Sequence, residues 1–169
     1  MSTLREDAKY IYTCAIEAVL PDEAVRRALD RADFPGRVIL VAAGKAAWRM
    51  ASAAKTALGD RIETGIVITK YDHVQSPIPG IVCREAGHPV PDENSLRGTD
   101  AALALTEDLT ESDTVVFLLS GGGSALFEKP LLPLAELQDV TNQLLAAGAD
   151  IVEINTIRKR LSAVKGGRF

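Results

Sequence analysis

The sequence predicts an α/β fold in which an open, mainly parallel sheet is covered by helices on both faces. Two apolar runs, at Arg37–Ala43 and Thr114–Leu119, are typical of strands buried on both faces. Both runs end in a glycine turn, and a helix is expected after each turn. Shorter strands are expected between these units, at Thr64–Thr69 and Ile81–Arg84. Because ligands of open parallel sheets bind beyond the carboxyl ends of the strands, the two glycine turns form the candidate site.

The composition is typical of a soluble, single-domain protein. Its 169 residues are enough to bury roughly 70% of the surface that the unfolded chain exposes. A net charge of −4 and an aromatic content of 5% leave no basic stripe or stacking platform for nucleic acid. The apolar runs are too short for a membrane span, and the polar start Met1–Asp7 is unlike a signal peptide. Cys14 and Cys83 lie far apart in apolar segments, which favours small buried side chains and a reducing, cytoplasmic location.

Helical periodicity accounts for most of the remaining chain. Thr3 and Glu6 have the spacing of a capping box for an amphipathic helix over about residues 4–20, which Pro21 ends. A second helix is expected over about residues 23–30, with its arginines in solvent. Another helix, which carries Leu96, Leu103 and Leu109, is expected after the candidate caps Asp92, Asn94 and Ser95. Two more helices are expected, one over about residues 134–147 and one in the segment 150–169.

Lys45 is the first candidate for chemistry. It follows the end of a predicted strand and Gly44, which places it at the carboxyl edge of the sheet in the first turn of the next helix. A cation at a helix N-terminus is disfavoured by about 0.3–1 kcal/mol. We therefore expect Lys45 to face an anionic ligand; the alternative is a lysine that points into water.

The second candidate is the glycine loop, Ser120-Gly121-Gly122-Gly123-Ser124. Its glycines let the backbone adopt positive φ and approach a ligand closely, and its serines add hydroxyl donors. A helix that opened at Ser124 or Ala125 would turn free N–H groups toward an anion. The loop is therefore predicted to hold a phosphate or carboxylate, although it matches neither the dinucleotide-binding pattern nor the P-loop. A tight turn that merely needs glycine is the alternative.

The two histidines are weaker candidates. His88 lies in the loop that follows the Ile81–Arg84 strand and is a candidate for the wall of the site, and no second ligand is spaced to form a metal site with it. His73 lies in a polar loop and is expected to be solvated.

Four stretches, taken in order, resemble the N-terminal domain of the two-domain glycerate 2-kinases, a family also called hydroxypyruvate reductases or the MOFRL-associated family. They are Val41–Ala47, Gly87–Asp92, Ser120–Ala125 and Asn155–Gly167. The resemblance runs from the first helix to the end of the chain. It implies a Rossmann-like fold and transfer of the γ-phosphoryl group of ATP to the 2-hydroxyl of D-glycerate, with Mg²⁺, which gives 2-phosphoglycerate.

The resemblance also implies roles for individual residues. Lys45 matches the family's active-site lysine, and Ser120, Gly121, Gly122, Gly123 and Ser124 match its ligand-binding loop. Arg158 and Lys165 are expected to approach the same cleft. No metal ligand is expected within this chain, because the family's magnesium-binding aspartate and its second domain follow the Lys-Gly-Gly segment.

We therefore expect residues 1–169 to form a single N-terminal kinase domain that is inactive alone. One alternative is a non-catalytic phosphosugar-binding module, because such modules also hold their ligand at a turn rich in serine and glycine between a strand and a helix. Another is a truncated remnant whose exposed apolar sheet face pairs with a second copy, which gives a homodimer, or with another chain. An NAD-dependent reductase is disfavoured, because no predicted strand is followed by G-x-G-x-x-G with an acidic residue about 20 positions on.

Overall fold

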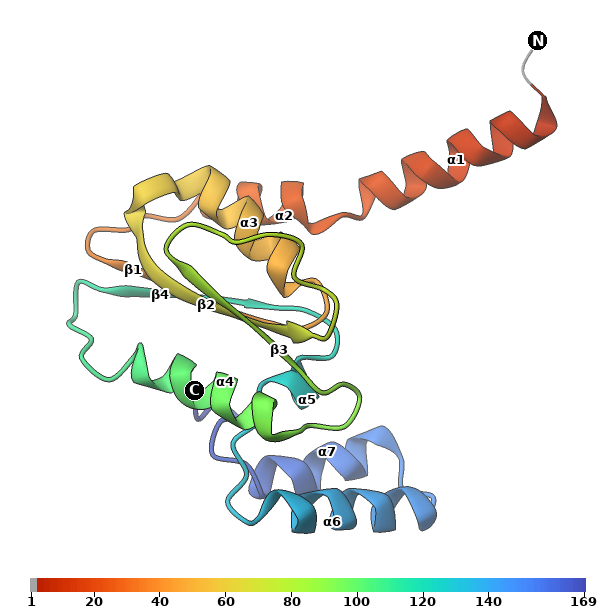
Figure 1. Ribbon diagram of the computed structural model, residues 1–169, viewed down its shortest axis with the longest axis vertical. Helices are drawn as coiled ribbons and strands as arrows, with labels where there is room; N and C mark the ends of the chain where they lie inside the picture. Colours follow the sequence, from red (N-terminus) through yellow and green to blue (C-terminus); the bar gives the residue numbers. More distant parts are fainter. Residues whose placement is uncertain (1–2) are drawn as a thin grey trace.

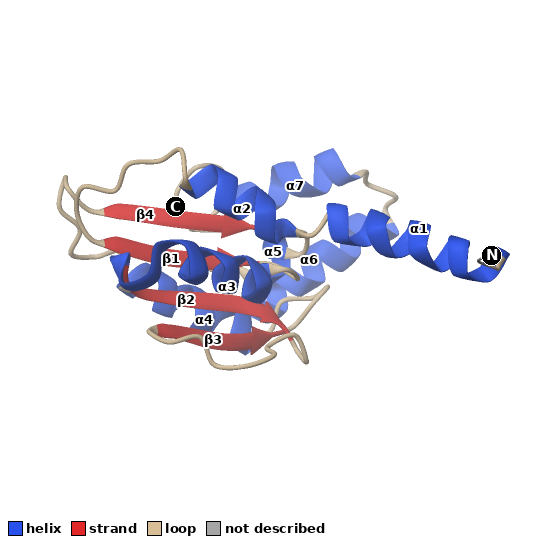
Figure 2. Cartoon of the chain, turned by 90° about the horizontal axis from the view of Figure 1, so that it is seen from above, coloured by secondary structure: helices blue, strands red, loops and turns tan. Residues whose placement is uncertain are grey.

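The computed structural model describes residues 3–169, so Met1 and Ser2, the start of the polar N-terminal stretch, lie outside the described part of the chain. Four strands form one sheet in the order β3-β2-β1-β4, and every neighbouring pair is parallel (Figures 1 and 2). The strands are β1 (Val38–Ala43), β2 (Ile62–Lys70), β3 (Ile81–Ala86) and β4 (Thr114–Leu119). This confirms the predicted α/β fold and its four strands.

Helices cover both faces of the sheet (Figure 1). One face carries α2 (Pro21–Leu29) and α3 (Ala47–Leu58), which ends in a turn of 3-10 helix, η1 (Gly59–Arg61). The other face carries α4 (Glu93–Ala104) and α5 (Gly123–Leu126), with α6 (Leu134–Ala146) and α7 (Ile151–Arg160) beyond α5. None of the helices within residues 3–169 combines the length and apolar character that a membrane span requires.

The core lies on both sides of the central strand β1, whose six residues are all buried. Successive side chains of a strand point to opposite faces, so Val38, Leu40 and Ala42 pack toward α2 and α3 while Val41 and Ala43 pack toward α4 and α5. Burying each of the larger aliphatic side chains stabilises the fold by about 1.5–3 kcal/mol. The result is a rigid sheet whose carboxyl edge holds the turns that follow β1 and β4.

Strand β4 departs from the prediction that it is buried on both faces. Its side chains are only partly covered, and Phe117 and Leu119 are 38% and 57% exposed. The reason is its position at the edge of the sheet, where β1 is its single neighbouring strand among the described residues. An apolar sequence was therefore sufficient to predict the strand but not its burial.

The first helix, α1 (Leu4–Ala18), forms with its predicted capping box, in which the Thr3 hydroxyl accepts from the Glu6 N–H and the Glu6 carboxylate accepts from the Thr3 N–H. It extends away from the rest of the domain and buries none of its side chains (Figure 1). The prediction that Cys14 is buried is consequently wrong, because this cysteine lies on α1 and is exposed.

Two further expectations about apolar side chains need correction. Cys83 is half-buried rather than buried, and this partial burial raises the pKa of its thiol. Leu109 does not share a face with Leu96 and Leu103, because α4 ends at Ala104 and Leu109 lies in the exposed connection to β4.

Candidate functional site

The two predicted glycine turns meet at the carboxyl edge of the sheet, where the neighbouring strands β1 and β4 end. The Lys45 N–H donates to the Gly121 carbonyl at 2.8 Å, and the Ser120 N–H donates to the Ala43 carbonyl at 2.9 Å. The Ser120 hydroxyl accepts from the Ala46 N–H at 3.0 Å, just before α3 begins. These three bonds join the turn after β1 to the glycine loop, with Ser120 as the link between them.

Gly122 is the residue of the glycine loop that packs against both His88 and Lys45. Its φ is 91°, in the left-handed region that favours glycine. A Cβ atom at this position would lie 2.8 Å from Cδ2 and 2.9 Å from Nε2 of His88, and 3.2 Å from Cγ of Lys45. The missing side chain therefore lets the imidazole and the lysine stem pack directly on the loop. His88 thus lies where the sequence suggested a wall of the site.

The Lys45 side chain lies along the glycine loop, with its Cε close to Gly121 as well as its Cγ close to Gly122. Lys45 precedes α3 rather than occupying its first turn, because the helix begins at Ala47. Lys45 is exposed, and no acidic side chain within residues 3–169 forms an ion pair with it. A cation beside a helix N-terminus with no internal counter-charge favours an anionic ligand.

His73 was missed as a neighbour of this site. It is half-buried rather than solvated, and its Nδ1 lies 2.9 Å from the Lys45 carbonyl oxygen. The Glu85 carboxylate at the end of β3 accepts from the N–H groups of His73 and Val74, both at 2.9 Å. These bonds, that from Val74 foremost, lower the pKa of Glu85. These bonds fix the loop after β2 beside Lys45. The contact arises because β1 and β2 are neighbours in the sheet, so it could not be predicted from either segment alone.

A cavity of 330 Å³ opens beside Lys45. Its lining includes Lys45, Arg49 and His73, together with the carboxylate of Asp72. Arg49 is paired with Asp22 at 2.6 Å. Lys45 is therefore the unpaired cation in this lining.

Arg158 and Lys165 lie on the other side of the glycine loop. The Arg158 guanidinium donates to the Ser124 carbonyl at 3.0 Å, and the Lys165 ammonium donates to the Phe127 carbonyl at 2.9 Å. Both cations also contact the carboxylate of Glu128, which is fully buried. Nothing in the sequence singles out Glu128, except that it is an acidic residue directly after an apolar turn.

The predicted site residues thus form two groups joined by the glycine loop and the short helix α5. Lys45, Ser120, Gly121 and Gly122 lie on the side of β1. Gly123, Ser124 and Lys165 line a second cavity, of 350 Å³, which Asn155 and Lys159 also reach. Arg158 lies behind this second group, with its side chain 13% exposed.

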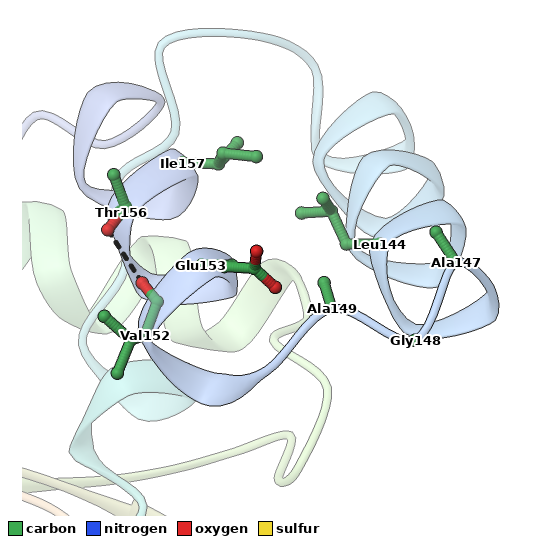
Figure 3. A pocket seen from close by; sticks show the side chains of 8 residues that line it. All are labelled: Leu144, Ala147, Gly148, Ala149, Val152, Glu153, Thr156 and Ile157. Atoms are coloured by element: carbon green, nitrogen blue, oxygen red, sulfur yellow. Dashed lines mark hydrogen bonds between the residues drawn. The ribbon is translucent and has the colours of Figure 1, made fainter.

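A further cavity contains none of the predicted site residues. It measures 660 Å³ and lies between α6 and α7, where Leu144, Glu153 and Ile157 face the space between the helices (Figure 3). Among the described residues, no group of three histidine, cysteine, aspartate or glutamate side chains is placed to hold a metal ion.

Comparison with known proteins gives consistent relatives. The chain is 55% identical over 169 residues to a D-glycerate 2-kinase of Thermotoga maritima and 42% identical over 168 residues to a glycerate 2-kinase of Pyrococcus horikoshii. These matches cover 99% and 92% of this chain but only 40% and 38% of the two relatives. The chain therefore spans about two fifths of the length of the relatives it matches.

The fold comparison agrees with the sequence comparison. A crystal structure of glycerate kinase from Thermotoga maritima superimposes with a TM-score of 0.92 over 98% of this chain and 40% of that chain. The model of a domain of unknown function, DUF4147, matches residues 7–169. The chain therefore belongs to the DUF4147 family, the N-terminal domain of the glycerate 2-kinase family.

Proposed function

We propose that this chain is the N-terminal domain of an ATP-dependent D-glycerate 2-kinase, which transfers the γ-phosphoryl group of ATP to the 2-hydroxyl of D-glycerate. The names and the identity of the relatives support this reaction. One observation carries the proposal for the site: Lys45, a cation without an ionic partner among the described residues, lies along the glycine loop at the carboxyl edge of the sheet.

Phosphoryl transfer needs positioning and neutralisation of negative charge more than it needs covalent chemistry. In the proposed role, the Lys45 ammonium neutralises charge on the transferred phosphoryl group. Gly121 and Gly122 bring backbone N–H groups close to the same anion, while Ser120 holds the loop to the turn after β1. The Gly123 N–H donates to the Ser120 carbonyl at 3.2 Å and so shapes the loop, and Ser124 adds a hydroxyl on the side of the second cavity. Arg158 and Lys165 add positive charge on the side of Ser124.

Kinases of this kind use Mg²⁺ to neutralise and orient the phosphates. The described residues offer no cluster of three ligands for a metal, and we place the magnesium-binding aspartate outside residues 1–169, as the resemblance implies. We therefore assign no step of the reaction to a metal held by this chain.

We propose residues 1–169 as one Rossmann-like domain that acts with further parts of a longer kinase. We also propose a cytoplasmic location, where ATP is available and the free thiols of Cys14 and Cys83 stay reduced. The exposed apolar side chains of β4 favour a homodimer of this chain in isolation, which sedimentation velocity can measure.

A chimera tests the proposed reaction. In the Thermotoga enzyme, the segment that this chain matches is replaced by residues 1–169, and ADP release is measured with and without D-glycerate. The 55% identity over the matched segment makes a folded chimera a reasonable expectation. We expect release that depends on D-glycerate, and a loss of about 100-fold or more in kcat for Lys45→Ala, typical of removing a group that stabilises transition-state charge.

Lys9→Ala is the matched control, because Lys9 is exposed on α1, away from the glycine loop. It should leave the rate unchanged. A folded chimera whose activity survives Lys45→Ala would remove Lys45 from the proposed mechanism. A chimera that binds sugar phosphates but releases no ADP would favour the phosphosugar-binding module instead.

A further inference from the structure

Glu128 is the one fully buried ionisable side chain within the described residues. It follows α5, and a single oxygen of its carboxylate, Oε2, serves two cations. The Arg158 Nη2 lies 3.2 Å and the Lys165 Nζ 2.7 Å from this oxygen. The side chains of the two cations are only 13% and 15% exposed. A buried carboxylate is costly unless it is paired, so this arrangement constrains all three side chains together.

The main chain at Glu128 is held by α4. The Glu128 N–H donates to the Thr99 hydroxyl at 2.9 Å, and that hydroxyl donates to the Ser95 carbonyl at 2.9 Å. Ser95 and Thr99 are themselves fully buried. Glu128 is therefore a fixed point, whereas Arg158 and Lys165 come from α7 and from the turn that follows it.

Besides Glu128, both cations contact main-chain carbonyls at or just after the end of the glycine loop. Arg158 also donates to the Ser124 carbonyl, and Lys165 also donates to the Phe127 carbonyl. An ammonium group has three protons, and these contacts use two of those of Lys165. Lys165 lines the 350 Å³ cavity together with Ser124 and Asn155. Two cations and one carboxylate leave a net charge of +1 beside this cavity.

We propose that Glu128 is a positioning residue, which fixes Lys165 and Arg158 against the Ser124 end of the glycine loop so that their excess positive charge faces an anion in the adjoining cavity. The pairing with Glu128 stands on the contacts themselves. Only the identity of the anion, a phosphate group, rests on the proposed function.

The protonation of Lys165 reports on this pairing. The charged groups that face it are Glu128, Arg158 and, across the cavity, Lys159. Burial lowers the pKa of Lys165, the Glu128 carboxylate opposes that effect, and Arg158 adds to it. Removing the charge of Glu128 should therefore lower the pKa of Lys165 further and leave more free amine at a given pH.

The experiment is brief acetylation of the 169-residue chain with acetic anhydride over a range of pH, with the extent of modification at Lys165 measured by mass spectrometry. Glu128→Gln keeps the size of the side chain and removes its charge. We expect the midpoint of the Lys165 labelling curve to move down by about one pH unit, which is about a tenfold faster reaction below both midpoints. Glu107→Gln, at an exposed carboxylate in the connection after α4, should leave the curve unchanged.

Circular dichroism first establishes that each variant is folded. If Glu128→Gln does not fold, Glu128→Asp is measured instead. Its side chain keeps the charge but is one methylene shorter, which holds the carboxylate farther from Lys165. It should shift the midpoint in the same direction by a smaller amount. An unchanged midpoint in a folded Glu128 variant would overturn the proposal, since a role confined to packing would not move this curve when the charge is removed.

A second arm separates this inference from the proposed function. Inorganic tripolyphosphate is added to the wild-type chain at about 100 mM, above the Kd of about 30 mM that corresponds to about 2 kcal/mol, with sodium chloride of equal ionic strength as the control, and we expect it to slow the labelling of Lys165. A shifted midpoint in Glu128→Gln with no protection by tripolyphosphate would support the positioning of Lys165 by Glu128 and contradict phosphate as the anion. Protection together with an unshifted midpoint would support the phosphate site and overturn the role of Glu128.

Discussion

At Gly122, the backbone of the glycine loop and the side chains of the candidate site come into direct contact. The residue combines positive φ with two close neighbours, His88 and Lys45. Gly148, in the turn between α6 and α7, also has positive φ, at 75°, but a Cβ there would meet no atom within 4 Å. Alanine substitutions at the two glycines therefore distinguish the free-energy cost of backbone strain from the cost of a steric clash.

Gly122→Ala should destabilise the domain by more than Gly148→Ala. The left-handed conformation costs an alanine about 1–2 kcal/mol at either position. At Gly122 the clash with the His88 ring adds about 1 kcal/mol or more, as is usual when an extra methyl enters a packed site. Urea unfolding followed by circular dichroism measures both losses. Equal losses at the two positions would show that His88 moves away freely.

Single residues were predictable where local chemistry made them unusual. Lys45 and the loop Ser120–Ser124 were found because a lysine near a helix start and three consecutive glycines are each odd in the sequence alone. Glu128 was missed because its importance comes from Arg158 and Lys165, whose approach is set by tertiary packing. No periodicity or spacing in the sequence contains that information.

Strands β1 and β4 show the same limit at the scale of elements. Both are apolar runs followed by a glycine turn, yet β1 is buried and β4 is partly exposed. Which strand becomes the edge depends on the order of the sheet, which the sequence of either strand does not encode. Helix α1 is a second case, since its periodicity and capping box predict the helix but not its partner.

The start of β4 is held to β1 by an ion pair that should make stability depend on pH. Arg37 forms two bonds to Asp113, at 3.0 and 2.8 Å, and the Thr110 N–H and hydroxyl also donate to this carboxylate. The Asp113 side chain is 3% exposed. The hydrogen bonds from Arg37, and then that from the Thr110 N–H, hold the pKa of Asp113 well below its ordinary value.

Because the pKa of Asp113 is lower in the folded chain, its stabilising effect is complete above the ordinary aspartate pKa of about 4 and is lost as the pH falls below it. Asp113→Asn should therefore lower the urea midpoint at pH 7, and the difference from wild type should narrow at pH 3. Glu111→Gln, at an exposed neighbouring carboxylate, is the control and should have little effect at either pH. A difference in urea midpoint between Asp113→Asn and wild type that stays constant from pH 7 to pH 3 would contradict this account.

At the scale of the whole molecule, the fold was predictable because each strand–turn–helix unit can be recognised from its own sequence and parallel sheets restrict how such units combine. The site was predictable only in part, since one cavity arises where the turn after β1 meets α3 and the loop after β2, and the other arises where β4 meets α7. The chain also spans about two fifths of the length of its kinase relatives, which is why we propose that this domain supplies only part of the active site.

We expect the isolated 169-residue chain to show no measurable transfer of phosphate from ATP to D-glycerate. A helix-terminus anion site contributes at most about 2 kcal/mol, whereas millimolar affinity requires about 4 kcal/mol, so millimolar ATP would occupy the glycine loop to only a few per cent. The measurement is ADP release by the purified chain, with the chimera described above as the positive control. Turnover at ordinary enzyme rates that disappears in Lys45→Ala would show that residues 1–169 contain the complete active site. In that case both the expected magnesium-binding aspartate and the expected second domain would be unnecessary for catalysis.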